Sequence, residues 1–370
     1  MTATILSGAK PSEHSGATTA PDFGDLRAEF QALLSGCGIY DLSTRAKIAV
    51  TGGDRVRWLN GMVTNNVRDL APNHGLYGFL LNAQGRIQGD LYAYNLGDSL
   101  MVDTDGCQRE NVLAHFDKYI IADDVEVADV SATVAAIGLA GPQARDVLNK
   151  AGIHAPDLAP LELCSPQCDC ACGRLQCTLV RGDNARGDNV QGDNVRGDNS
   201  AGSSYEIWLA PDKLKSTWDA LVAAGAAAVG AGALELRRIS YGIPRYGVDI
   251  RDRDLPQETA QTRALNFTKG CYLGQEIVER IRSRGAVHRQ FTAFAVEGTL
   301  PEPGAKIVSA IIGSTVGADE KEVGEITSSA ILPLPGGDRP VALGYLRREA
   351  EGKDLHAGMA KLKPASLPIA

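Results

Sequence analysis

An early β-hairpin signature is the feature that most constrains the fold of this chain. Residues 77–81 and 87–94 are apolar or alternate in polarity, and the turn between them reads Asn-Ala-Gln-Gly. Further short strands alternate with segments of helical periodicity, such as residues 23–34 and 109–119. This alternation predicts an α+β fold with mostly antiparallel sheets, rather than a doubly wound parallel sheet. The sequence contains no phosphate-binding glycine loop of the Walker or Rossmann type.

Size and charge limit the classes of protein that this chain can represent. Its 370 residues are enough for two or three domains, and the apolar share of 44% supports hydrophobic cores. A net charge of -8 argues against a broad nucleic-acid surface, so we expect no direct nucleic-acid partner. No apolar run reaches the ~18–20 residues of a membrane helix, and no signal peptide is recognisable. We therefore expect a cytoplasmic protein without a membrane partner.

Changes of pattern along the chain predict the domain boundaries. We expect residues 1–24 to be a disordered tail, followed by an α+β body with two lobes at residues 25–286. Residues 287–351 alternate or run apolar between Pro/Gly turns, which predicts a small C-terminal β-barrel or sandwich of about five strands. Residues 352–370 are predicted to be a second tail.

Residues 155–203 interrupt the body with two unusual compositions. The second part repeats a Gly-Asp-Asn unit with almost no apolar content, which predicts a flexible loop between strands at 175–180 and 205–209. The first part is crowded with cysteines: Cys164, Cys168, Cys170, Cys172 and Cys177. Their short spacings allow a soft-metal site, but no matching histidine follows, so an insertion without a specific role is favoured over a metal site.

The stretch from Lys269 to Glu276 carries the most distinctive chemistry. It places Cys271 between two glycines, beside a lysine and ahead of a short predicted helix. A helix N-terminus and a nearby ammonium both favour the thiolate, which is the form that attacks electrophiles and binds metals. The alternative is a buried cysteine in a glycine-rich turn.

Several segments resemble one known family. The octapeptide Lys-Gly-Cys-Tyr-Leu-Gly-Gln-Glu at 269–276 is similar to the signature of the YgfZ folate-binding proteins, relatives of the glycine-cleavage T-protein (aminomethyltransferase, GcvT). The segments at 50–67, 81–87, 237–250, 324–328 and 342–346 agree with it. The resemblance implies a GcvT-like, multi-domain ring that binds tetrahydrofolate in a central cavity. It also implies a role in the assembly or repair of iron–sulfur clusters in client enzymes, including a radical-type enzyme of tRNA modification.

The resemblance assigns roles to individual residues. Cys271 would be the functional thiol, in a loop shaped by Lys269, Gly270, Tyr272, Gly274, Gln275 and Glu276. Glu206 and Arg238 would contact the folate. Where T-proteins carry two adjacent acids, this chain has Gly89 and Asp90, so a single carboxylate remains. From the residues alone, Glu206 and Arg238 are better explained as surface charges, and Tyr77, Phe79 and Tyr92 as core aromatics rather than cavity-lining rings.

Three functional hypotheses follow. The first is a tetrahydrofolate-binding protein of iron–sulfur cluster assembly or repair that depends on Cys271 and meets its client enzymes transiently. The second is a folate-dependent aminomethyltransferase or one-carbon transferase in which Asp90 holds or activates the folate. The third is a thiol sensor or metal-binding module centred on residues 164–177. The lone acid at position 90 and the Lys-Gly-Cys motif favour the first, and whether the protein turns over a substrate is left open.

Overall fold

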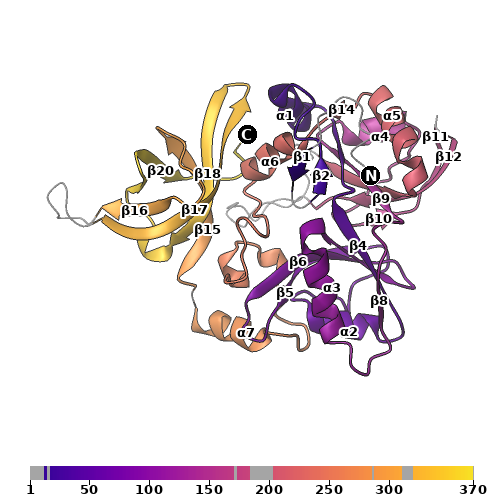
Figure 1. The fold of residues 1–370 in the computed structure, drawn as a ribbon, viewed down its shortest axis with the longest axis horizontal. Helices are drawn as coiled ribbons and strands as arrows, with labels where there is room; N and C mark the ends of the chain where they lie inside the picture. The colour runs from indigo at the N-terminus through magenta and orange to yellow at the C-terminus, as the bar shows by residue number, and fades with distance from the viewer. Residues whose placement is uncertain are drawn as a thin grey trace.

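Three of the β-sheets each form one lobe of the structure: a five-stranded sheet, a seven-stranded sheet and a closed barrel (Figure 1). The computed structural model describes residues 12–14, 17–170, 173–183, 203–285, 287–310 and 320–369. The predicted α+β architecture with a separate C-terminal barrel is confirmed. In Figure 1 the segment that follows α6 (Ala231–Ser240) runs between the barrel and the five-stranded sheet.

The first lobe is a five-stranded antiparallel sheet in the order β5-β6-β7-β4-β8. The predicted hairpin is its first pair, because β5 and β6 are joined by the Asn-Ala-Gln-Gly turn. Two helices, α2 and α3, contribute apolar side chains to one core with this sheet. The elements are β4 (Arg45–Thr51), α2 (Arg55–Met62), β5 (Gly75–Leu81), β6 (Ile87–Asn95), β7 (Leu100–Asp105), α3 (Arg109–Lys118) and β8 (Glu126–Asp129).

The second lobe is a seven-stranded sheet in the order β10-β12-β13-β9-β3-β14, with β11 paired to β12. One face packs on α4 and α5, while Tyr94, Trp208 and Val180 form a separate cluster with Ala136 and Leu163. Its elements are α1 (Leu26–Ser35), β3 (Gly38–Asp41), β9 (Ala135–Ala140), α4 (Ala144–Lys150), β10 (Leu163–Cys164), β11 (Gln167–Cys170), β12 (Gly173–Arg181), β13 (Ser204–Leu209), α5 (Leu214–Ala223) and β14 (Ala227–Ala228).

The interrupting segment belongs to this second sheet. Strands β12 and β13 pair as antiparallel neighbours on either side of the Gly-Asp-Asn repeat, as the sequence predicted. Most of the repeat, residues 184–202, lies outside the described residues.

The third lobe is a closed barrel in the order β15-β18-β17-β16-β19-β20, with β20 pairing back to β15. The prediction of a tail at 352–370 is wrong, because β19 and β20 lie in this segment and complete a barrel of six strands. Leu355 and Leu362 are buried in the barrel core. The strands are β15 (Arg289–Glu297), β16 (Lys306–Ala310), β17 (Glu320–Leu334), β18 (Gly337–Arg347), β19 (Leu355–Ala357) and β20 (Ala360–Pro364).

Both ends of the described chain are attached to α6. Ser12–His14 (β1) pairs with Ala17–Thr19 (β2), and the carbonyl of Ala20 accepts a hydrogen bond from the amide of Ala231. The predicted tail at 1–24 is therefore wrong for these residues, while residues 1–11, 15 and 16 lie outside the description. Near the other end, the amide of Ile369 donates to the carbonyl of Ser240.

One further α-helix and five short 3-10 segments complete the described structure. Helix α7 (Gln275–Arg284) lies below the five-stranded sheet in Figure 1. The 3-10 segments are η2 (Gly106–Gln108), η3 (Pro211–Lys213), η4 (Pro256–Glu258), η5 (Thr262–Ala264) and η6 (Arg348–Ala350). Within the described part of the chain, every helix is too short or too polar to cross a bilayer.

The last strand provides a direct test of the closed barrel. We expect Leu362→Ala to lower the free energy of unfolding by about 3 kcal/mol, because it removes a buried leucine that is 2% exposed. Its neighbour Lys361 has a side chain that is 43% exposed, so Lys361→Ala should cost less than about 0.5 kcal/mol. Urea unfolding of both variants measures the difference. Equal, small losses would mean that this segment is a tail after all.

Candidate functional site

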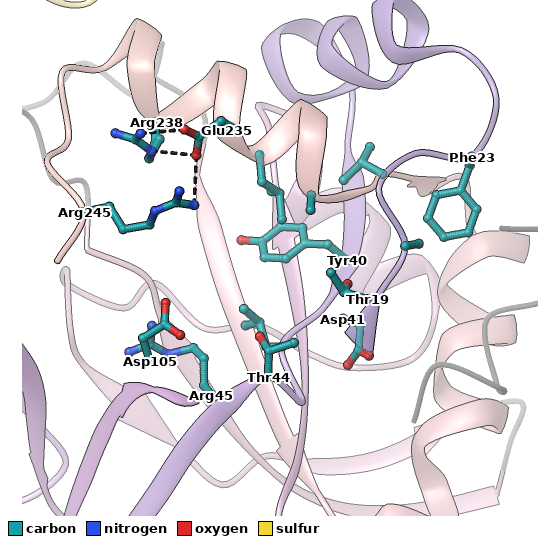
Figure 2. A pocket seen from close by; sticks show the side chains of 15 residues that line it. Thr19, Phe23, Tyr40, Asp41, Thr44, Arg45, Asp105, Glu235, Arg238 and Arg245 are labelled. Carbon is teal, nitrogen blue, oxygen red and sulfur yellow. Dashed lines mark hydrogen bonds and ion pairs between the residues drawn. The ribbon is translucent and has the colours of Figure 1, made fainter. Parts of the chain in front are cut away.

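Two adjoining cavities lie where the lobes meet. The first, which we call the Tyr40 cavity, has a volume of about 230 Å³ and is shown in Figure 2. The second, the Asp90 cavity, has a volume of about 200 Å³. Four residues line both of them: Arg45, Asp105, Arg238 and Arg245. We refer to the two together as the paired cavities.

Asp90 projects from β6 into the cavity named after it. Its Oδ2 accepts a hydrogen bond from Tyr77 Oη at 2.7 Å, and its Oδ1 accepts one from Gln108 Nε2 at 2.7 Å. Among the described residues no cation forms an ion pair with this carboxylate. Its oxygens therefore keep acceptor capacity for a ligand, because a carboxylate offers about four lone-pair sites.

The neighbouring position explains why one acid is enough at this strand. Successive strand residues point to opposite faces, so position 89 faces away from the Asp90 cavity. A Cβ atom at Gly89 would lie 3.1 Å from Gln108 Oε1 and 3.8 Å from a methyl of Val112 in α3. An acidic side chain there would displace Gln108, which holds Asp90. Of the two positions, only 90 lines the cavity.

Arg238 lines both cavities, but it is already fully engaged. Its Nε and Nη2 donate to Glu235 at 2.7 and 2.5 Å, and its Nη1 donates to Asp249 at 2.8 Å. Nη2 also donates to Ser328 Oγ of the barrel at 2.7 Å. The arginine expected to contact a folate therefore fastens α6 to the barrel and forms part of the cavity wall.

Glu206 lies on the second sheet outside the lining of either cavity. The row Tyr40, Gly138 and Glu206 runs across three paired strands, and the Tyr40 ring lies over the Gly138 backbone. Glu206 Oε2 accepts a hydrogen bond from Trp208 Nε1 at 2.9 Å and lies 3.8 Å from Lys47 Nζ. The Glu206 side chain is 20% exposed and is separated from Tyr40 by Gly138, so it is not a free surface charge.

Tyrosines supply the flat surfaces of the paired cavities. Tyr77 and Tyr92 line the Asp90 cavity with ring centroids 5.1 Å apart, whereas Phe79 is fully buried in the core. Burial raises the pKa of Tyr40 to about 12, so its hydroxyl stays protonated and can donate a hydrogen bond. Arg263 lies over the Tyr77 ring at 4.2 Å and pairs with Asp183.

Cys271 is exposed and is not among the residues that line the paired cavities. Helix α7 begins at Gln275 after an N-cap at Gly274, so the thiol lies before the first turn. The helix predicted to follow the cysteine is confirmed, but the thiol lies three residues before the N-cap, whereas a helix dipole acts mainly within the first turn. Its exposure also excludes the alternative of a buried cysteine.

Lys269 is committed to backbone carbonyls rather than to the thiol. Its Nζ donates to the carbonyls of Asn60, Val63 and Asn65 at 2.5, 2.7 and 2.6 Å. The side chain is buried, and burial lowers the pKa of Lys269 to about 7, while the three carbonyl contacts favour the ammonium form. Through these three contacts the lysine holds the Cys271 loop against the end of α2.

The rest of the motif serves the same loop. Gly274 has φ +81°, and a Cβ there would lie 2.5 Å from the carbonyl oxygen of Asn82, so only glycine fits. Gly270 has open space around it. Tyr272 is buried and its amide donates to Gln275 Oε1 at 3.3 Å. Glu276 is exposed, with Arg280 3.8 Å away in the next turn.

The cysteine-rich segment is only partly described. Cys168 and Cys177 are buried, with their sulfurs 3.8 Å apart. The side chains of Cys170 and Cys172 lie outside the described residues. Among the residues that are described, no group of three or more possible ligands could hold a metal ion.

The amino-acid sequence is similar to those of aminomethyltransferases. Residues 5–161 match the family model described as GCVT N-terminal domain. An aminomethyltransferase from Rubrobacter xylanophilus is 27% identical over 348 residues, which cover 93% of this chain and 85% of the relative. One from Picosynechococcus sp. is 27% identical over 350 residues, which cover 93% and 88%.

The fold comparison covers the whole chain. The crystal structure of glycine cleavage system aminomethyltransferase T from Bartonella henselae superposes with a TM-score of 0.81, covering 98% of this chain and 94% of that one, at 21% identity. The chain therefore has a GcvT-like fold with a terminal barrel, and residues 5–161 match the GCVT N-terminal domain.

Several cavity residues were not singled out as candidates from the sequence, among them Arg45, Arg245, Tyr246 and Arg263. Arg245 and Tyr246 lie within the family segment at 237–250, so the signal was present there. Tyr246 Oη donates to the carbonyl of Gln88 at 3.0 Å, a contact 158 residues away in sequence. Nothing local to Arg45 or Arg263 marks either of them.

The three contacts of Lys269 can be tested through stability. Lys269→Met keeps the length of the stem but leaves three carbonyls without their donor. We expect the free energy of unfolding to fall by about 3 kcal/mol, because buried acceptors without partners are costly. Lys215→Met, at a site 56% exposed, should cost less than about 0.5 kcal/mol. Denaturant titration compares them, and equal values would show that the carbonyl contacts do not form in solution.

Proposed function

We propose that this chain binds a reduced folate in the paired cavities and transfers a one-carbon unit, as a folate-dependent aminomethyltransferase. The observation that carries the proposal is the carboxylate of Asp90, held by Tyr77 and Gln108 and facing a tyrosine-lined cavity. Curated relatives that match 93% of the chain carry the name aminomethyltransferase, which supports the same activity. Sites for ligands of this size usually span several hundred Å³, which two adjoining cavities supply.

The chemistry of the ligand fits the lining. A pterin is flat and carries N–H donors, so tyrosine rings can pack against it and a carboxylate can accept from its amine. In the transfer, a carbon leaves an aminomethyl group on a lipoyl thiol and joins the nitrogens of tetrahydrofolate. The products are methylene-tetrahydrofolate, ammonia and the free thiol. Asp90 would hold the amine and steer its proton as the new carbon–nitrogen bond forms.

Asp90→Asn tests this role. We expect the rate of methylene-tetrahydrofolate formation from a lipoyl-aminomethyl donor to fall by about 100-fold or more, because an amide cannot accept a proton. Tetrahydrofolate binding should change by less than about 10-fold, because the amide keeps one acceptor oxygen. Asp98, exposed in the loop between β6 and β7, provides the control variant Asp98→Asn with unchanged activity. If the wild type makes no methylene-tetrahydrofolate, the transferase proposal fails.

A second candidate function is maintenance of iron–sulfur clusters, as in the YgfZ family. The observation in its favour is that Cys271 is exposed, away from the paired cavities, on a loop fixed by Lys269 and Gly274. A rigidly presented external thiol suits chemistry on another protein more than chemistry on a ligand inside the cavities. The two candidates use different residues and are therefore separable.

Cys271→Ser separates them. If the thiol acts on a client, the cluster content and activity of a radical-type tRNA-modifying enzyme should fall to background in cells that carry only this variant. Folate binding and aminomethyl transfer should stay within about twofold of wild type, because the residue lines neither cavity. Cys107→Ser, at the other cysteine that is exposed among the described residues, is the matched control. Normal client activity with Cys271→Ser would remove the iron–sulfur proposal and leave the transferase proposal standing.

A further inference from the structure

Arg45 holds an unusual position among the charged residues of the paired cavities. It begins β4, its side chain is 21% exposed, and it lines both cavities. Its Nε donates to Asp103 Oδ1 at 2.7 Å. Across the described part of the chain, its two terminal nitrogens make no hydrogen bond. The outer edge of this guanidinium is therefore available to a ligand.

The other three arginines of the paired cavities are differently placed. All three guanidinium nitrogens of Arg238 donate hydrogen bonds. The acceptors are Glu235, Asp249, Ser328 and the carbonyl of Ile243. Arg245 donates to Glu235 at 3.1 Å, and Arg263 pairs with Asp183. These contacts hold the walls of the cavities together. Arg45 thus differs from them in having an open fork of N–H donors.

The orientation of Arg45 is fixed from behind by buried charge. Asp103 is fully buried, and its second oxygen accepts from Lys47 Nζ at 2.6 Å. Lys47, with a side chain that is 1% exposed, also lies 4.4 Å from the centre of the Trp208 ring. Burial opposes the charge of Arg45, but the carboxylates of Asp103, Glu206 and Asp105 outweigh it and raise the pKa of Arg45. The guanidinium is therefore preorganised and always charged.

Figure 2 shows what faces Arg45 across the Tyr40 cavity. Arg45 and Asp105 lie on one side, and the ion-paired group of Arg238, Glu235 and Arg245 lies on the other. Asp105 is near Arg45 but forms no ion pair with it within the described residues. A ligand between these two sides meets one open planar fork, which matches a carboxylate because both groups can form two parallel hydrogen bonds.

We propose that Arg45 binds a carboxylate of the glutamyl group of the reduced folate, at the boundary of the two cavities. The inference rests on the proposed folate function and adds the residue that recognises the acidic end of the ligand. Asp103 and Lys47 are positioning residues in this arrangement, since they hold the guanidinium without touching the ligand. The pterin end lies with Asp90 and the tyrosines.

Calorimetric titration with two ligands tests the proposal. Tetrahydrofolate carries the glutamyl carboxylates, whereas methyltetrahydropterin has the same ring and no carboxylate. For Arg45→Gln we expect affinity for tetrahydrofolate to fall by about 10- to 100-fold, the usual effect of losing charge-assisted hydrogen bonds. Affinity for methyltetrahydropterin should change by less than twofold. Arg109→Gln, at a site 45% exposed, should leave both affinities unchanged.

A second variant distinguishes weaker ligand binding from loss of the folded structure. Arg45→Lys keeps a cation beside buried Asp103 and so keeps its ion pair, but it removes the fork. It should show wild-type thermal unfolding and weaker tetrahydrofolate binding. If both variants bind tetrahydrofolate as wild type does, or lose both ligands equally, the assignment of Arg45 is wrong. If wild-type protein binds neither ligand, the proposed function itself fails, and the two outcomes are thus distinct.

Discussion

The cavities of this protein depend on one buried ion pair, between Arg238 and Asp249. Asp249 is fully buried and accepts hydrogen bonds from Arg238, from the amide of Arg245, and from Thr327 and Ser328 of the barrel. Breaking such a pair by removing one partner usually costs about 3–5 kcal/mol, because the other charge is left buried alone. The pair therefore fixes the barrel against α6, which carries part of the cavity wall.

That constraint divides the cavity residues into two groups. Arg238, Glu235 and Arg245 form hydrogen bonds with one another and with other residues of the cavity walls. Asp90 and Arg45 are instead each held on one side by neighbours and remain open on the other. Preorganised polar groups of this kind lose little entropy when a ligand binds. A negative and a positive anchor, set on one sheet, suit a ligand with an amine at one end and acids at the other.

Features that depend on residues close together in the sequence were predictable, whereas features that depend on distant residues were not. The β5–β6 hairpin was predictable because its turn and alternation are local, and the strands around the repeat were predictable for the same reason. β19 and β20 were missed, since three and five residues are too short to show a period and only barrel closure stabilises them. Arg238 lines both cavities, but its bond to the barrel was not predictable, because its partner Ser328 lies 90 residues away. Arg45 owes its orientation to Asp103, 58 residues later, and no local signal encodes that contact.

The closed barrel also bears on how the protein is made. Strand β20 pairs back to β15, so the barrel cannot close until Pro364 has left the ribosome. Ser328, which bonds to Arg238, is held by that barrel. A nascent chain can therefore fold its two sheet lobes early, yet it gains the finished wall of its cavities only after residue 364 has emerged. Chains that terminate early would emerge with the lobes formed and the binding site incomplete.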